Sequence, residues 1–177
     1  MSMAEFLVGE FDHESGTTRK VLERVPEEHA AWAPHTKSKS MGELANHIAG
    51  LPVWVGRILN APEYDFLAPG APTPGIRPWE SKSALLAKHD KNVADARALI
   101  AKASDAQFLE PWSMKRGGEV MFTLPRIAVL RSMVYSHAVH HRGQLTVYLR
   151  LKDVPLPGVY GPSADDNPWA PPKGAGA

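Results

Sequence analysis

The sequence predicts an all-α protein that folds as a four-helix bundle and forms a single domain over residues 1–177. Four stretches carry apolar residues at the spacing of three and four that is typical of an amphipathic helix. Connections rich in proline and glycine separate these stretches, and such segments interrupt helices. A chain of 177 residues is long enough to bury its own core, and without cysteine it does so without disulfide bonds.

Composition narrows the class of partner. The chain has 20 Lys and Arg residues against 19 Asp and Glu residues, and the basic residues are scattered, which disfavours binding to nucleic acid. No apolar run reaches the about 18 residues of a membrane-spanning helix, and acidic residues interrupt the apolar N-terminal stretch, unlike in a signal peptide. We therefore expect a cytoplasmic protein that acts on a small molecule and binds neither nucleic acid nor membrane.

The first helix is predicted over residues 4–25, where Pro26 ends the apolar repeat. His13 lies in this helix between Asp12 and Glu14. A histidine among charged neighbours is expected at a solvated surface or an interface, and a role as a metal ligand is the alternative.

The second helix is predicted over residues 41–59. Ser40 and Glu43 have the S-x-x-E spacing of a capping box, in which the two side chains satisfy backbone amides at the helix start. His47 lies on the apolar stripe of this helix, either as a core histidine bonded to a neighbour or as a metal ligand. Pro52 removes a hydrogen bond inside the helix and predicts a kink about a turn beyond His47.

A long crossover is predicted over residues 60–80, because proline and glycine exclude regular structure there. It is either a functional loop or a plain connector. Four apolar side chains indicate that it packs against the helices: Tyr64, Phe66, Ile76 and Trp79.

The third helix is predicted over residues 83–103. His89 lies on its narrow apolar seam, so a competing metal trio that includes His89 stays open. Between the third and fourth helices, a Gly117-Gly118 pair separates two runs typical of strands. This pattern predicts a small β-hairpin, which we expect to be an appendage of the bundle.

The fourth helix is predicted over residues 124–151, with Thr123 as its N-cap and Pro125 in its first turn. Gly143 interrupts this helix and predicts close packing against another helix, including one from a second subunit. Residues 152–177 are too rich in proline and glycine for a helix. They are predicted to form an extended tail that wraps the bundle and frays at its end.

A histidine pair in the fourth helix is the strongest chemical signal. His137 and His141 stand four residues apart, so both imidazoles project from one helix face. Two neutral imidazoles at this spacing can bind one divalent ion, and His47 from a facing helix is our candidate for the third ligand. Three histidine ligands leave positions for water or substrate, as in catalytic sites. The alternative is a pair of hydrogen-bonded histidines in a polar pocket or a dimer face.

His140 points about 100° away from His141 around the same helix and is expected to face outward or towards an interface. Zinc, nickel and other divalent ions accept three imidazoles plus water, and zinc or nickel is expected here. Three further residues are candidates to orient a ligand or to meet an anionic substrate, with a solvated helix face as the alternative role: Glu43, Arg142 and Gln144.

The chain resembles the DinB-like superfamily over nearly its whole length. The segments that carry the resemblance are RVPEEHAAWAPHTKSKSMGELANHIAGL, PWSMKRGGEVMFTLPR and SHAVHHRGQLTVYLRLKDVPLPGVYGPSADD. The last is the most specific, because it joins H-x-x-x-H-R-G-Q-L to VPLPGVYGPSADD. The resemblance implies an up-down-down-up four-helix bundle, commonly a homodimer, with a divalent metal held at the positions of His47, His137 and His141.

The resemblance also implies a reaction class. Similar proteins include S-transferases that depend on mycothiol or bacillithiol and a thiol-dependent maleylpyruvate isomerase, in which the metal activates a low-molecular-weight thiol. We therefore predict a metal-dependent enzyme of the thiol S-transferase kind. One alternative is a metal-dependent hydrolase with metal-bound hydroxide and a carboxylate such as Glu43 as proton acceptor. The other is a non-catalytic, stress-related bundle whose metal is structural or absent.

Overall fold

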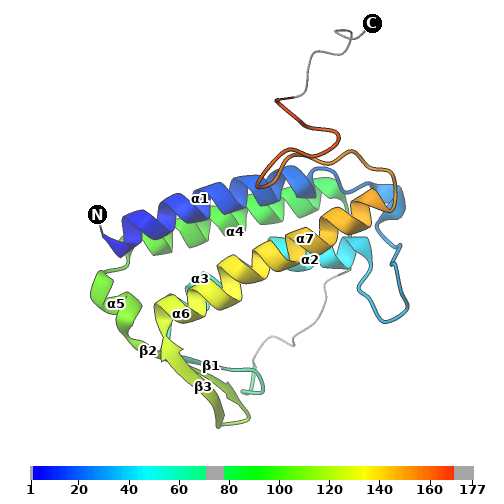
Figure 1. Cartoon of the computed structure of the whole chain (residues 1–177). Helices are drawn as coiled ribbons and strands as arrows, with labels where there is room; N and C mark the ends of the chain where they lie inside the picture. Colours follow the sequence, from blue (N-terminus) through cyan, green and yellow to red (C-terminus); the bar gives the residue numbers. More distant parts are fainter. Residues whose placement is uncertain (1, 71–77, 170–177) are drawn as a thin grey trace, which may run out of the picture.

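The computed structural model describes residues 2–70 and 78–169, and these residues form a mostly helical protein with a small three-stranded sheet at one end (Figure 1). The helices are α1 (Met3–Leu22), α2 (Met41–Gly50), α3 (Val53–Asn60), α4 (Lys82–Lys102), α5 (Asp105–Leu109), α6 (Arg126–Leu130) and α7 (His137–Arg150). The strands are β1 (Glu63–Asp65), β2 (Pro111–Arg116) and β3 (Glu119–Pro125). A π-helical segment, Arg131–Ser136, joins α6 to α7.

The long helices lie side by side and enclose two apolar clusters. Helix α1 packs against α4 and α7, and α2 packs against α4 and α7. One cluster lies towards the sheet and contains Phe11, Ile58 and Trp112. The other lies between α1, α2 and α7 and contains Leu44 and Leu145. The four-helix arrangement, its up-down-down-up connectivity and its description as one domain stay predictions, since the observed helices are more divided than predicted.

Helix α1 ends at Leu22, three residues before the predicted end at Val25. The backbone tightens there, because Arg24 donates to the Val21 carbonyl and Val25 donates to the Leu22 carbonyl. The residue before a proline is disfavoured in the helical region, so the helix stops ahead of Pro26.

Pro52 divides the second predicted helix in two. Helix α2 ends at Gly50 and α3 begins at Val53, so the predicted disruption at Pro52 is found and the single helix over residues 41–59 is wrong. The kink itself stays a prediction. Proline has no amide hydrogen to continue the helical ladder, and α3 starts with Pro52 in the N-cap position.

The crossover between α3 and α4 contains regular structure, contrary to our prediction. Strand β1 pairs in parallel with β2 through Glu63–Ser113, Tyr64–Met114 and Asp65–Lys115. The Asp65 carboxylate also accepts hydrogen bonds from the backbone amides of Gly117 and Gly118, at 2.8 and 2.7 Å. Three of the four apolar side chains expected to pack do so: Tyr64, Phe66 and Trp79. The fourth, Ile76, lies outside the described residues.

The predicted β-hairpin is confirmed as β2 and β3, but it is not an appendage. The side chain of Trp112 is 0% exposed, and its indole N–H donates to the Arg57 carbonyl at 3.2 Å. Met114 is also part of the apolar core. Helix α5, which precedes the hairpin, was not predicted; Ser104 caps it by accepting from the amide of Gln107.

The fourth helix begins at Arg126, after strand β3, and Thr123 does not cap it. The Thr123 hydroxyl instead lies 2.7 Å from that of Ser113 on the neighbouring strand. Gly143 has no close neighbour within the described chain, so the predicted close packing is not found there, and packing against a second subunit stays a prediction.

The part of the tail that the structure describes lies on the helices, as predicted. Val154, Leu156 and Val159 pack against the cluster between α1, α2 and α7. The fraying expected at the extreme end concerns residues 170–177, which lie outside the described residues. Among the described residues, no helix is both long and apolar enough to cross a membrane.

Candidate metal centre

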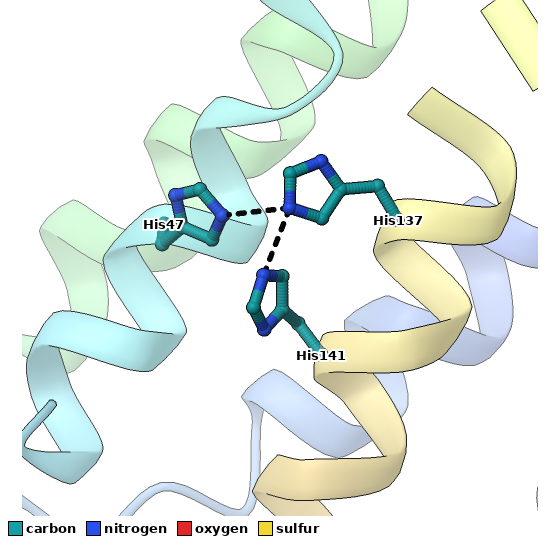
Figure 2. Close-up of side chains that lie close together, drawn as sticks. All are labelled: His47, His137 and His141. Carbon is teal, nitrogen blue, oxygen red and sulfur yellow. Dashed lines mark hydrogen bonds between the residues drawn. The ribbon is translucent and has the colours of Figure 1, made fainter. Parts of the chain in front are cut away.

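Three histidines from two helices converge on one point (Figure 2). His47 comes from α2, and His137 and His141 come from α7. The Nε2 atom of His137 lies 3.3 Å from Nε2 of His47 and 2.9 Å from Nε2 of His141. Among the described residues, only this trio brings three potential metal ligands of the His, Cys, Asp or Glu type within reach of one ion.

The convergence follows from the antiparallel packing of α2 and α7. At the start of α2, the Met41 amide donates to the Trp32 carbonyl at 2.8 Å. The Trp32 ring packs edge-on against Tyr148, near the end of α7, with ring centroids 5.8 Å apart. The beginning of α2 therefore lies near the end of α7. Further along α2, His47 faces the two histidines near the start of α7.

Two of the imidazoles form a hydrogen bond through the ring nitrogen that faces away from the other histidines. Nδ1 of His141 lies 2.7 Å from Oε1 of Gln144, an oxygen that can only accept, so this nitrogen carries the proton. The ring of His137 donates to the backbone carbonyl of Met133, and since its Nε2 faces the other histidines, the donating nitrogen is Nδ1. In the neutral rings, both Nε2 atoms then present lone pairs to each other. A bound cation removes this conflict.

The electrostatic surroundings keep the three histidines neutral near pH 7. Burial, followed by the neighbouring histidines and then Lys39 and Lys88, lowers the pKa of His47 to about 4. Burial is also the main cause that lowers the pKa values of His137 and His141. Neutral imidazole is the form that binds a metal, so metal binding near pH 7 does not have to displace protons from these three rings.

The donor set fits a divalent transition ion. Three nitrogens around a tetrahedral ion at about 2.1 Å lie about 3.4 Å from one another. The Nε2 separations of 3.3 and 2.9 Å are close to this value. Imidazole ligands suit zinc, nickel, copper and iron, and a second group that fixes the ring through Nδ1 is usual at such sites.

The sequence profile of the DinB superfamily matches residues 10–145, most of the chain and all three histidines. The chain belongs to the DinB superfamily. The resemblance noted from the sequence is therefore confirmed.

This DinB-superfamily chain is similar to one curated protein in sequence and to two solved structures in fold, in each case over most of its length. It is 25% identical over 160 residues to the uncharacterized protein YrdA of Bacillus subtilis strain 168, covering 90% of this chain and 88% of that protein. Its fold is similar to that of the DinB-like protein YjoA of Bacillus subtilis, with a TM-score of 0.64, 19% identity, and coverage of 86% of this chain and 96% of that one. Its fold is also similar to that of a DinB-like protein of Bacillus cereus ATCC 10987, with a TM-score of 0.65 and 22% identity, and the match covers 90% of this chain and 98% of that one. At these identities the solved structures show a shared fold alone.

The three residues predicted to orient a ligand or to meet an anionic substrate, Glu43, Arg142 and Gln144, each contact a different part of this DinB-superfamily protein. Gln144 contacts His141, as described above. Glu43 completes the capping box of α2, because its Oε2 accepts from the Ser40 amide at 2.8 Å. Arg142 is 1% exposed and faces away from solvent, contrary to the alternative of a solvated residue.

Arg142 forms a buried link between three parts of the chain. Its guanidinium pairs with the Glu14 carboxylate of α1 at 2.7 Å and donates to the Tyr160 hydroxyl of the tail at 2.7 Å. It also donates to the Thr18 hydroxyl at 3.1 Å. These contacts use its donors to hold α1, α7 and the tail together, so a role in meeting an anionic substrate is not supported.

The other three histidines considered from the sequence lie outside the trio. His13 is exposed, as expected for a surface position. His89 is 3% exposed and lies 3.3 Å from the Asp90 carboxylate, so the competing trio that includes His89 is wrong. His140 is exposed, and its ring centroid lies 4.9 Å from that of His141.

Two residues near the site were missed. Met133 contributes a backbone carbonyl, which has no side-chain signature, and the π-helical segment around it has none either. Lys39 acts electrostatically on His47 and His141. It stands eight residues before His47 in a proline-containing connection, where its spacing says nothing about α7.

Proposed function

We propose that this protein binds a divalent ion, zinc or nickel, through His47, His137 and His141, and that it is a metal-dependent enzyme of the thiol S-transferase kind. One observation carries the metal site: three Nε2 atoms converge while Gln144 and the Met133 carbonyl occupy the opposite nitrogens of two rings. The reaction class rests on the family resemblance, since similar proteins use a low-molecular-weight thiol of the mycothiol or bacillithiol type.

The residues of the chain divide the work between binding and orientation. The three histidines supply neutral ligands, and Gln144 and Met133 fix the rings that carry two of them. A bound divalent ion would act as a Lewis acid that lowers the pKa of a thiol or a water beside it. No protein thiol competes with the substrate thiol, because the chain has no cysteine.

The geometry supports the hydrolase alternative less well. That alternative needs a general base within hydrogen-bond reach of the attacking water. Its candidate, Glu43, holds the Ser40 amide at the start of α2, one turn and more from His47. The S-transferase needs no such base, because a thiol with a lowered pKa loses its proton to solvent.

Metal analysis and thiol chemistry test the proposal together. The protein is purified without a histidine tag, its metal content is measured by mass spectrometry, and consumption of a low-molecular-weight thiol is followed with a model electrophile such as monochlorobimane. We expect one zinc or nickel per chain and a thiol consumption that His141→Ala abolishes. Stoichiometric metal without thiol binding or consumption would instead favour a structural metal in a non-catalytic protein.

The proposal includes a homodimer and a cytoplasmic location. The family resemblance supports the dimer, and reduced low-molecular-weight thiols are characteristic of the cytosol. Sedimentation equilibrium of the metal-loaded protein tests the dimer, for which we expect about twice the mass of one chain.

A further inference from the structure

Arg57 of α3 packs against two aromatic rings. Its guanidinium carbon lies 4.5 Å from the ring centroid of Trp54 on the same helix and 4.7 Å from that of Tyr64 on β1. The two rings meet edge-on with centroids 5.1 Å apart, and Phe66 packs against both. We call these four partly buried side chains the Arg57 cluster. The attraction between a guanidinium and aromatic rings holds Arg57 in place before any ligand binds.

The backbone that carries the Arg57 cluster is anchored as well. The Arg57 carbonyl accepts from the buried Trp112 indole at 3.2 Å. The guanidinium of Arg126 donates to the Ala61 carbonyl, directly after α3, at 2.7 Å. Tyr64 is fixed by the pairing of β1 with β2. The cluster therefore stands on defined elements, at the end of the molecule that holds the sheet (Figure 1).

The charge of Arg57 has no partner of opposite sign. Other arginines form ion pairs with carboxylates: Arg19, Arg97, Arg126, Arg131, Arg142 and Arg150. Arg24 and Arg116 form none, but both are exposed to water. Within residues 2–70 and 78–169, Arg57 is thus the only partly buried arginine without a carboxylate partner. A charge that is withdrawn from water is costly unless it is paired.

The Arg57 cluster offers hydrogen-bond donors and lacks acceptors to match them. The guanidinium of Arg57 and the indole N–H of Trp54 can only donate, and the hydroxyl of Tyr64 can also donate. In the part of the chain that the structure describes, none of these three groups has a hydrogen-bond partner. Contact with the aromatic rings uses none of the N–H groups of the guanidinium. An oxyanion supplies both the missing acceptors and the missing negative charge.

We propose that the Arg57 cluster is a binding site for an oxyanion, meaning a carboxylate, sulfate or phosphate group, which Arg57 holds through two parallel N–H···O bonds. The planar fork of the guanidinium matches such groups, and Trp54 and Tyr64 position it. The anion is either free in solution or part of a larger organic molecule. This site depends on neither the metal nor the thiol reaction, so it goes beyond the proposed function.

Nuclear magnetic resonance of the full chain tests the site directly. Inorganic phosphate and phenyl phosphate are titrated at constant pH, with sodium chloride keeping the ionic strength constant, and the side-chain N–H signals of Arg57 and Trp54 are followed. We expect both signals to shift in a saturable way with both probes. Equal affinities would support a site for the free anion. Tighter binding of phenyl phosphate would support an anion carried by an organic molecule that packs against the rings.

Three variants define the role of the guanidinium. Arg57→Gln removes the charge and should weaken both probes about tenfold or more, as read from the Trp54 signal. Arg57→Lys keeps the charge but loses the planar fork, so its affinity should lie between those of Arg57→Gln and the wild type. Arg116→Gln is the matched control, since it removes an exposed, unpaired arginine from β2 and should bind both probes as the wild type does. Circular dichroism melting establishes that each variant is folded.

Several results would overturn the inference. One is that neither probe shifts the Arg57 and Trp54 signals more than sodium chloride alone. Another is that Arg57→Gln weakens binding no more than Arg116→Gln does. If Arg57→Gln does not fold, the comparison of Arg57→Lys with the wild type decides, and equal affinities would contradict the paired N–H···O bonds. Because the signals report on α3 itself, each result holds whether or not the protein binds a metal or a thiol.

Discussion

The imidazoles of His137 and His141 meet through their Nε2 atoms, 2.9 Å apart, on consecutive turns of one helix. Each ring also has its opposite nitrogen engaged, His137 by the Met133 carbonyl and His141 by Gln144. Two neutral rings in these tautomers cannot hydrogen-bond to each other, because neither Nε2 carries a proton. The pair could share a cation, and Nε2 of His47, which lies 3.3 Å from Nε2 of His137, could serve as the third ligand.

Removing one ligand should remove the metal. We expect His137→Ala and His141→Ala to lose bound zinc or nickel during gel filtration, because two imidazoles hold an ion much more weakly than three. His140→Ala is the matched control, since it deletes an exposed imidazole next to His141. Mass spectrometry of the metal content measures all three. Equal metal content in His140→Ala and His141→Ala would contradict the assignment.

Gln144 should matter for affinity without being a ligand. Gln144→Leu leaves Nδ1 of His141 without its 2.7 Å partner, and loss of such a partner typically costs 10- to 100-fold in metal affinity. Gln144→Glu keeps an acceptor oxygen and should restore binding. Competition with a chromophoric chelator measures both affinities. Unchanged affinity in Gln144→Leu would show that the contact does not orient the ring.

Helix periodicity was enough to place the three histidines on facing sides of their helices. The spacing of residues along a helix predicts which face of the helix each side chain lies on. The S-x-x-E capping box at Ser40 predicts where α2 begins. It could not identify Lys39 or Met133. Their part in the site depends on how α2 meets α7 and on a backbone carbonyl, neither of which leaves a local pattern.

The missed elements share a dependence on distant parts of the chain. Strand β1 has three residues and exists through pairing with β2, about fifty residues later, so its sequence reads as a loop. From the sequence alone, Arg142 can also be a solvated residue, because charged residues on helices are usually exposed. Glu14 and Tyr160, far away in sequence, reverse that expectation by burying and pairing it.

The Arg142 link should be important for stability. Arg142→Met removes the cation that pairs with the Glu14 carboxylate, whose side chain is 14% exposed, and leaves it only the neutral Tyr160 hydroxyl at 2.9 Å. Breaking a buried pair on one side typically costs about 3–5 kcal/mol. Arg150→Met is the matched control on the same helix, since its pair with Asp165 is exposed and should contribute less than about 1 kcal/mol. Urea denaturation measures both, and similar losses in the two variants would contradict the prediction.

The metal-free protein should lose stability as the pH falls below about 6.5. Burial lowers the pKa of His47 from 6.5 to about 4, so the unfolded chain binds this proton more tightly than the folded protein. The stabilisation is complete above pH 6.5 and declines between pH 6.5 and about 4. The lowered pKa values of His89, His137 and His141 act in the same direction.

This pH dependence can be measured as the urea midpoint in the presence of EDTA. We expect a lower midpoint at pH 5 than at pH 7, and a smaller difference in His47→Asn, which lacks one of the contributing groups. Free carboxyl groups titrate near pH 4, so the interval from pH 7 to pH 5 is the one in which histidine titrates. A midpoint that rises on going from pH 7 to pH 5 would contradict the sign.

Trp112 should show that the hairpin is part of the core. Its side chain is 0% exposed, and its indole N–H is bonded to the Arg57 carbonyl at the end of α3. Trp112→Ala should therefore lower the free energy of unfolding by about 3–5 kcal/mol, through lost burial and the cavity left behind. Met121→Ala on β3 removes a side chain that is 57% exposed and should change it by less than about 0.5 kcal/mol. If both variants unfold like the wild type in urea, the hairpin is the appendage that its sequence alone predicts.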